Sequence, residues 1–178
     1  MIRRKRTQMS RPPDFRHGRY DTKAIQQCGK YVGRSVYWKL FSIENTLRMI
    51  IHSVLSVQAQ PEWWEEYVDG TIQRQAERLE KQYKNASTGT KPGEHMIYFV
   101  GMRDLGEIFR SNRNHFDPLI ADLDDWLLRI EAIRLPRNIV AHSNYPNIYD
   151  DKKVDRVYLE SKVLLRQVSQ RIQLHVPK

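Results

Sequence analysis

The sequence predicts an all-α protein, folded as a bundle of four to five helices that run up and down. Apolar residues recur at spacings of three and four positions over most of the chain, which is the period of a helix with one buried face. Proline and glycine residues separate these periodic stretches, as is typical of turns between helices. With 178 residues, the chain is long enough for one domain with a sizeable core.

The first predicted helix covers residues 35–57. Its apolar positions follow the helical period without interruption: Val36, Leu40, Ile43, Leu47, Ile50 and Val54. A second, strongly polar helix is expected from Pro61 to about Lys84, because a proline followed by glutamates is a favourable helix start. Residues 85–94 are rich in serine, threonine, glycine and proline, which indicates a surface loop.

The second half of the chain predicts three more helical stretches. Residues 96–100 form a short apolar run that we expect to be extended, leading into a helix over residues 102–113. Asp117 is expected to cap a long helix with Pro118 in its first turn, and its apolar seam is Leu119, Leu123, Trp126, Ile130 and Ile133. After a turn at residues 144–151, a closing helix is predicted by Val154, Val157, Leu164, Val168 and Ile172.

Positive charge is concentrated at the N-terminus. The chain carries a net charge of +9, of which residues 1–30 contribute +7, so the helical part is only slightly basic. We therefore expect a flexible basic arm at residues 1–30 and a helical domain at residues 31–178. Such an arm can hold RNA phosphates without reading sequence, through Arg3, Arg4, Lys5 and Arg6; a solvated arm with no specific partner is the alternative.

Composition excludes several other classes of protein. The single cysteine, Cys28, can form neither an internal disulfide nor a thiolate zinc site, and His52, His95 and His115 have no companions at metal-ligand spacing. No apolar run approaches the ~20 residues of a membrane span, and the basic N-terminus is not followed by a signal-peptide core. We therefore expect a cytoplasmic protein without a membrane segment, metal or cofactor.

One pair of residues carries chemistry that a core helix does not need. Arg137 and His142 lie five positions apart near the end of the long helix. Histidine can move protons near neutral pH, and arginine grips phosphate with a planar fork of donors, so together they could cleave RNA without a metal. Asn138 lies four positions before His142, on the same helical side, and could orient the imidazole or bind a phosphate oxygen.

The spacing of this pair poses a geometric problem. Five residues on a regular helix separate two side chains by roughly 140° and about 7.5 Å, so Arg137 and His142 diverge within one subunit. Pro136 could kink the helix and reorient the turn, or a second subunit could bring a symmetric copy opposite. We favour a homodimer, which would supply a separate acid and base.

Three further charged residues are expected to support the pair. Glu44 and Arg48 lie four positions apart and can form a local salt bridge, or Glu44 can face the cleft and hold an arginine in place. Arg134 could add a phosphate contact or be a solvated charge. The tryptophans Trp63, Trp64 and Trp126 are expected to pack, with base stacking by an exposed Trp63–Trp64 pair as the alternative.

The segment Arg137-Asn138-Ile139-Val140-Ala141-His142 resembles the Arg-x(4 to 6)-His motif of the HEPN superfamily (higher eukaryotes and prokaryotes nucleotide-binding). The resemblance covers about residues 33–175 and extends to Ile43-Glu44-Asn45-Thr46-Leu47-Arg48-Met49-Ile50-Ile51 and Phe99-Val100-Gly101-Met102-Arg103-Asp104-Leu105. It implies a helical dimer with metal-independent endoribonuclease activity, often a toxin or phage-defence effector. It also implies that Arg137 and His142 are catalytic and that Asn138 supports them.

The resemblance further suggests partners: RNA, a second copy of the chain, and an antitoxin or nucleotidyltransferase. Two alternatives stay open. The domain could bind RNA or a nucleotide without cleaving it, or it could be a helical protein-interaction subunit of a larger complex.

Overall fold

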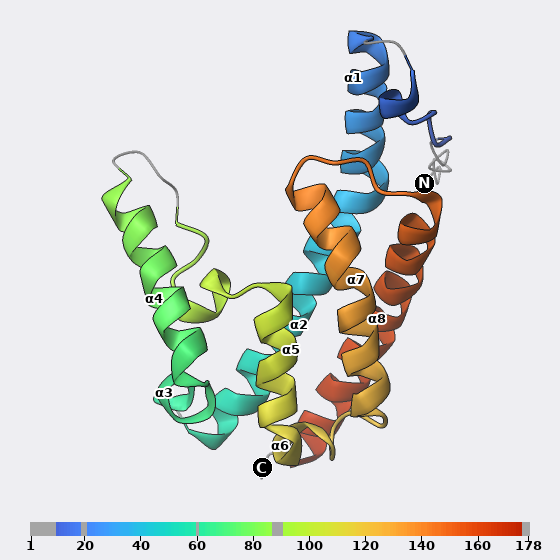
Figure 1. The fold of residues 1–178 in the computed structure, drawn as a ribbon. Coiled ribbons are helices and arrows are strands. Elements are labelled where there is room, and N and C mark those ends of the chain that lie inside the picture. Colours follow the sequence, from blue (N-terminus) through green and yellow to red (C-terminus); the bar gives the residue numbers. More distant parts are fainter. Residues whose placement is uncertain (1–9, 19–20, 60, 87–90, 176–178) are drawn as a thin grey trace, which may run out of the picture.

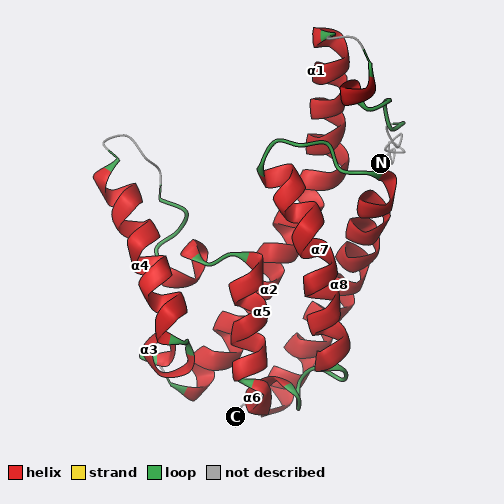
Figure 2. Ribbon diagram, viewed as in Figure 1, coloured by secondary structure: helices red, strands yellow, loops and turns green. Residues whose placement is uncertain are grey.

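A computed structural model of the protein describes residues 10–18, 21–59, 61–86 and 91–175. Within these residues every regular element is a helix and no strand occurs (Figure 2). The prediction of an all-α fold is therefore confirmed. None of the described helices is both long and apolar enough to cross a membrane.

Four helices form the bundle: α2 (Trp38–Gln58), α5 (Met102–Ser111), α7 (Leu123–Ala141) and α8 (Ile148–His175). Both α2 and α7 contact α5 and α8, so the four helices surround one core. Along the chain the direction alternates in Figure 1: α2 runs down, α4 (Gly70–Asn85) up, α5 down, α7 up and α8 down. The C-terminal end of α7 therefore lies at the same end of the bundle as the beginning of α2.

The expected second helix is divided into α3 (Trp63–Tyr67) and α4 (Gly70–Asn85). The helix is interrupted because the Asp69 carboxylate accepts the Thr71 amide and caps a new helix start. The side-chain amide of Gln73 stabilises the connection between α3 and α4 by donating to the backbone carbonyls of Trp64 and Val68. As a result α4 projects beside the bundle instead of continuing the line of α3 (Figure 1).

The structure corrects the prediction that all of residues 1–30 form a flexible arm. Residues Thr22–Tyr31 form helix α1, which continues through a π-helical segment, η2 (Val32–Tyr37), into α2. Cys28 is buried and its thiol donates to the Pro13 carbonyl, so residues 10–18 pack against α1. The arm residues Arg3, Arg4, Lys5 and Arg6 lie outside the described residues.

Two local predictions in the second half were wrong. The expected extended run is a short 3-10 helix, η3 (Met96–Phe99), and the long helix is capped by Asp122, not by Asp117. The Asp122 carboxylate accepts the Asp125 amide, whereas Asp117 follows the short helix α6 (Arg113–Phe116). Leu119 is nonetheless buried, because the intervening turn carries it into the core.

The core fills the space between these helices with aliphatic and aromatic side chains. The expectation that the tryptophans pack is confirmed, since Trp63, Trp64 and Trp126 are all buried. The buried Trp63–Trp64 pair is therefore not an exposed stacking platform.

Candidate functional site

A buried carboxylate joins two arginines at the end of the bundle where α7 meets α2. Glu44, on α2, accepts from Arg48 Nη2 at 2.5 Å and from Arg137 Nε at 3.2 Å. The side chains of Glu44 and Arg48 are 10% and 13% exposed, whereas Arg137 is 33% exposed. Both roles considered for Glu44 are thus realised: it forms the local salt bridge and it holds an arginine.

Arg48 also anchors η3 to α2. Its Nε donates to the Ile97 carbonyl at 3.2 Å and its Nη2 donates to the Val100 carbonyl at 2.9 Å. Its Nη1 donates to Asn45 at 3.1 Å. Arg48 therefore satisfies carbonyls at the end of a 3-10 helix and at the same time fixes Glu44 for Arg137.

His95 caps the other end of η3. Its Nδ1 accepts the Ile97 amide at 3.1 Å, and its ring stacks on Trp63 with centroids 4.8 Å apart. Burial lowers the pKa of the His95 imidazole below its ordinary value of 6.5, and nearby His52 lowers it further, against the opposing charge of Glu65. The neutral ring is the form that can accept the amide, since a protonated ring has no acceptor.

The protein should lose stability on acidification through His95. A lowered folded-state pKa means that this contribution is complete above pH 6.5 and is lost as the pH falls through the lowered pKa. Urea unfolding between pH 7.5 and 5 should therefore show a larger loss for wild type than for His95→Asn, whose side-chain oxygen can still accept the Ile97 amide but does not titrate. Parallel pH profiles of the two proteins would contradict this assignment.

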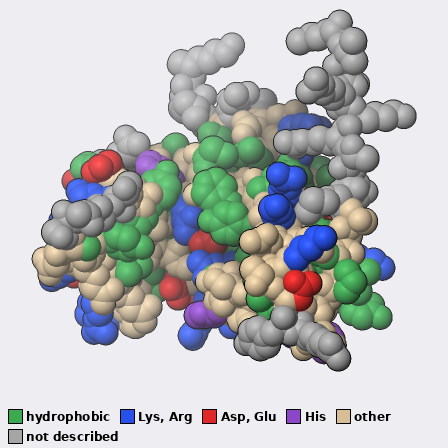
Figure 3. Space-filling model, turned by 90° about the horizontal axis from the view of Figure 1, so that it is seen from above, with side chains coloured by type: hydrophobic (Ala, Val, Ile, Leu, Met, Phe, Trp, Pro, Cys, Tyr) green, Lys and Arg blue, Asp and Glu red, His purple; other side chains and the backbone are tan. Residues whose placement is uncertain are grey.

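A cleft of about 750 Å³ opens above the Glu44 cluster, between α2, α4, η3 and the end of α7. Arg137, Val140 and Ala141 form the α7 wall, and the exposed aromatic side chains at the rim are Tyr37 (54%), Phe41 (59%), Tyr98 (42%) and Tyr83 (36%). Figure 3, seen from this end, shows hydrophobic side chains gathered beside charged ones. The cleft therefore combines flat apolar surfaces with a tethered guanidinium.

His142 lies just beyond this wall, at the C-cap of α7. The Ser143 amide donates to the Val140 carbonyl and the Asn144 amide donates to the Ile139 carbonyl, which together form a Schellman turn. Ser143 adopts the left-handed conformation that such a turn requires, with φ 58°. His142 itself is exposed, and among the described residues its side chain makes no hydrogen bond or ion pair.

The structure does not bring Arg137 and His142 together within one copy. Arg137 is directed to α2 by Glu44, whereas His142 does not line the cleft. Asn138 is partly exposed, and its carbonyl accepts the His142 amide at 3.0 Å. Arg134 pairs with Glu131 at 2.8 Å in a separate groove between α5 and α7, so it does not line the cleft either.

Sequence reasoning missed the aromatic rim and the turn geometry. Tyr37 and Phe41 lie four positions apart outside the apolar seam of the first predicted helix, and this spacing could have indicated an exposed aromatic pair. Tyr98 is packed against Gly93, where a Cβ atom would lie 2.4 Å from the ring. No local signal marks Ser143 as left-handed, because glycine is the usual residue at that position.

No group of three or more metal-ligating side chains occurs in the part of the chain that the structure describes. Comparisons with protein-family models, curated proteins and solved structures found no match to this chain. The functional argument therefore depends on the arrangement of Arg137, Glu44, His142 and the cleft.

Proposed function

We propose that the protein is a metal-independent endoribonuclease of the HEPN type, with an active site completed by a second copy of the chain. One observation carries this proposal. Glu44 holds the Arg137 guanidinium at the wall of a large cleft, and five residues later His142 is exposed at the helix end, where its side chain has no partner among the described residues. A phosphate clamp and a proton carrier are thus both accessible, although they diverge within one subunit.

The chemistry is the internal transfer of an RNA phosphodiester. The ribose 2′-oxygen attacks phosphorus, the bond from phosphorus to the 5′-oxygen breaks, and the products carry a 2′,3′-cyclic phosphate and a 5′-hydroxyl. One His142 takes the proton of the 2′-hydroxyl and a second, protonated His142 gives one to the leaving oxygen. Arg137 stabilises the negative charge on the phosphoryl oxygens. Glu44 engages its Nε and Nη2, and no described residue pairs with Nη1, which is therefore available for a phosphate oxygen.

An apolar stripe on the outer face of α7 supports the second copy. Leu128 is 70% exposed and Leu135 is 63% exposed, and Ala132 and Ile139 continue the spacing of four and three that ends at His142. This is the narrow seam by which two helices pair. Parallel pairing of two α7 helices along this stripe would bring the His142 side chains of the two copies, the proposed base and acid, close to one another.

Charged substitution of this stripe should dissociate the dimer. Leu128→Asp with Leu135→Asp places two carboxylates in the proposed seam, while both positions are exposed and the fold of one copy should persist. Light scattering at tens of micromolar should change from dimer to monomer, and cleavage should be lost with it. The matched control is Leu159→Asp with Val163→Asp on α8, 61% and 49% exposed, which should remain dimeric. A monomeric wild type that cleaves RNA would contradict the composite site.

The cleft and the N-terminal arm provide binding surface for RNA. Stacking of an unpaired base on an aromatic ring is worth about 1–3 kcal/mol, and the rim offers Tyr37, Phe41 and Tyr98. Arg3, Arg4, Lys5 and Arg6 would add phosphate contacts that weaken as salt rises. As a toxin or phage-defence effector, the protein would be restrained by an antitoxin or nucleotidyltransferase partner.

The aromatic rim also favours a second candidate function, RNA binding without cleavage. In that case RNA would bind in a salt-dependent manner, no products would form, and His142→Ala would change nothing. Binding that ignores salt would instead favour a protein-interaction subunit.

The test of the proposal is cleavage of RNA by the intact protein in excess chelator, with identification of the fragment ends. We expect cleavage at full rate, 2′,3′-cyclic phosphates and 5′-hydroxyls. Cleavage that requires a divalent cation, or fragments with 5′-phosphates, would overturn the proposed mechanism.

A further inference from the structure

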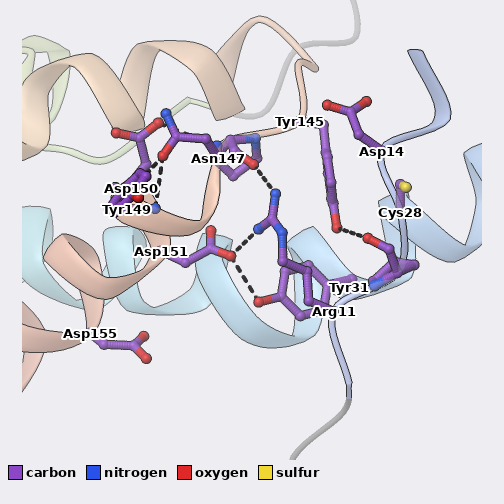
Figure 4. A network of polar contacts seen from close by, with 12 residues as sticks. Arg11, Asp14, Cys28, Tyr31, Tyr145, Asn147, Tyr149, Asp150, Asp151 and Asp155 are labelled. Atoms are coloured by element: carbon purple, nitrogen blue, oxygen red, sulfur yellow. Dashed lines mark hydrogen bonds and ion pairs between the residues drawn. The ribbon is translucent and has the colours of Figure 1, made fainter. Parts of the chain in front are cut away.

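The turn that follows His142 is held by the N-terminal segment. Residues 142–147 connect α7 to α8, and residues 144–147 have no regular structure of their own. The strap, which we define as residues 10–18, crosses this turn and hydrogen-bonds to it in several places (Figure 4). The segments that meet here lie about 130 positions apart in the sequence.

Tyr145 is the residue of the turn that the strap encloses. It is 2% exposed, and its hydroxyl donates to the Pro12 carbonyl at 2.8 Å. Arg11 lies over its ring with the guanidinium carbon 4.3 Å from the ring centre, and Tyr31 meets it edge-on. The Tyr145 carbonyl accepts from Arg16 at 2.9 Å. Both the side chain and the backbone of Tyr145 are therefore fixed by the N-terminal region.

Arg11 connects the strap, the turn and α8. Its guanidinium donates to the Pro146 carbonyl and forms an ion pair with Asp151 in the first turn of α8. The same Asp151 oxygen accepts from the Tyr31 hydroxyl of α1 at 2.8 Å. Asp151 is 7% exposed, so loss of Arg11 would leave a buried carboxylate without its cationic partner.

We propose that Arg11 is a positioning residue that fixes the His142 imidazole through the 142–147 turn. The His142 side chain has no partner among the described residues, so its location depends on the helix end before it and the turn after it. The strap restricts the turn and thereby lowers the conformational freedom of His142 before RNA binds. A displacement of about 1 Å of a reacting group can cost 10²-fold in rate, so such restriction has a large effect on turnover. This inference rests on the proposed nuclease function for its effect on cleavage, but not for its effect on the turn.

The experiment compares Arg11→Ala with Arg156→Ala by amide hydrogen exchange and by cleavage kinetics. Arg156 is an exposed arginine on α8, so its variant removes the same charge without touching the turn. For Arg11→Ala we expect about tenfold faster exchange at Ser143 and Asn144, and a kcat lowered by about 10- to 100-fold with KM changed less than twofold. Arg11→Lys, which keeps the cation over Tyr145, should recover part of kcat.

The outcomes separate this inference from the proposed function. A raised KM with unchanged kcat would show that Arg11 contacts RNA and does not position His142. Unchanged exchange at the turn would show that the strap does not restrain the turn. Either result overturns the proposal. If wild type cleaves no RNA, the nuclease function fails, but the exchange measurement still tests whether Arg11 and the strap restrain the 142–147 turn. If Arg11→Ala raises exchange throughout the bundle, the variant has lost stability as a whole. Tyr145→Phe, which removes only the hydrogen bond to Pro12, then tests the restraint of the turn by the same exchange and cleavage measurements.

Discussion

Replacing His142 with alanine is expected to slow RNA cleavage by about 10²- to 10⁴-fold, the usual contribution of a general acid or base. Arg137→Ala should slow it by about 10²- to 10³-fold, because it removes a fixed donor to the transition-state charge. Stability should change little in His142→Ala, since the side chain is exposed and has no partner in the described part of the chain. Single-turnover rates in chelator, together with urea midpoints, check both statements.

Mixing the two inactive variants tests whether the site is shared between copies. If Arg137 of one copy acts with His142 of the other, a dimer of one Arg137→Ala chain and one His142→Ala chain keeps one Arg137 together with one of the two histidines. One of the two proton transfers is then still assisted, so subunits refolded together should cleave RNA faster than His142→Ala alone and more slowly than wild type. If the two residues act within one copy, every mixed dimer lacks a complete pair and mixing restores nothing.

Substitution of Glu44 is expected to give the largest loss of stability in the site. Glu44→Gln removes the charge that Arg48 and Arg137 share, and leaves two guanidinium groups facing one another without a counterion. Removing one partner of a buried ion pair costs about 3–5 kcal/mol, and because Arg137 is partly exposed we expect a value near the lower limit. Chemical denaturation with a fixed m-value measures it.

A matched control separates this effect from the loss of any surface ion pair. Glu131 also pairs with an arginine on its own helix, but its side chain is 61% exposed, so Glu131→Gln should leave the urea midpoint unchanged. In a double-mutant cycle, Glu44→Gln should lower the free energy of unfolding less in the Arg48→Met background, because one of the two guanidinium groups that lose their counterion is then absent. Equal losses for Glu44→Gln in both backgrounds would contradict the shared-carboxylate arrangement.

Helical periodicity predicted the bundle where burial is regular. All six apolar positions of the first predicted helix are buried, Val36 in η2 and the other five in α2, because a helix with one continuous apolar face turns that face toward the core. Helix ends were less predictable: Asp117 with Pro118 is a good start signal, yet the Asp122 carboxylate caps α7. Two candidate caps five residues apart are distinguished by the tertiary packing of Leu119, which local sequence patterns do not contain.

The candidate site was predictable in its residue types but not in its connections. Glu44 lies 93 positions from Arg137, and its helical spacing to Arg48 could not decide between a local salt bridge and a contact with an arginine in the cleft. The strap was mistaken for part of a flexible arm, because its composition is basic and rich in proline. What orders it is a contact between Arg11 and Asp151, 140 positions apart, and composition carries no signal for such a pairing.

The π-helical segment η2 rotates the side chains of α1 about the helix axis relative to those of α2. A π-helical turn contains one residue more than an α-helical turn, so it changes by about 100° the direction in which α1 presents its side chains relative to α2. With this offset, Tyr31 reaches Asp151 while Leu40 and Glu44 still point into the bundle. Deleting a single residue from Val32–Tyr37 would restore a regular α-helix and turn Tyr31 away from the Asp151 carboxylate. The number of residues in η2 therefore sets how α1 and the strap are aligned with α8.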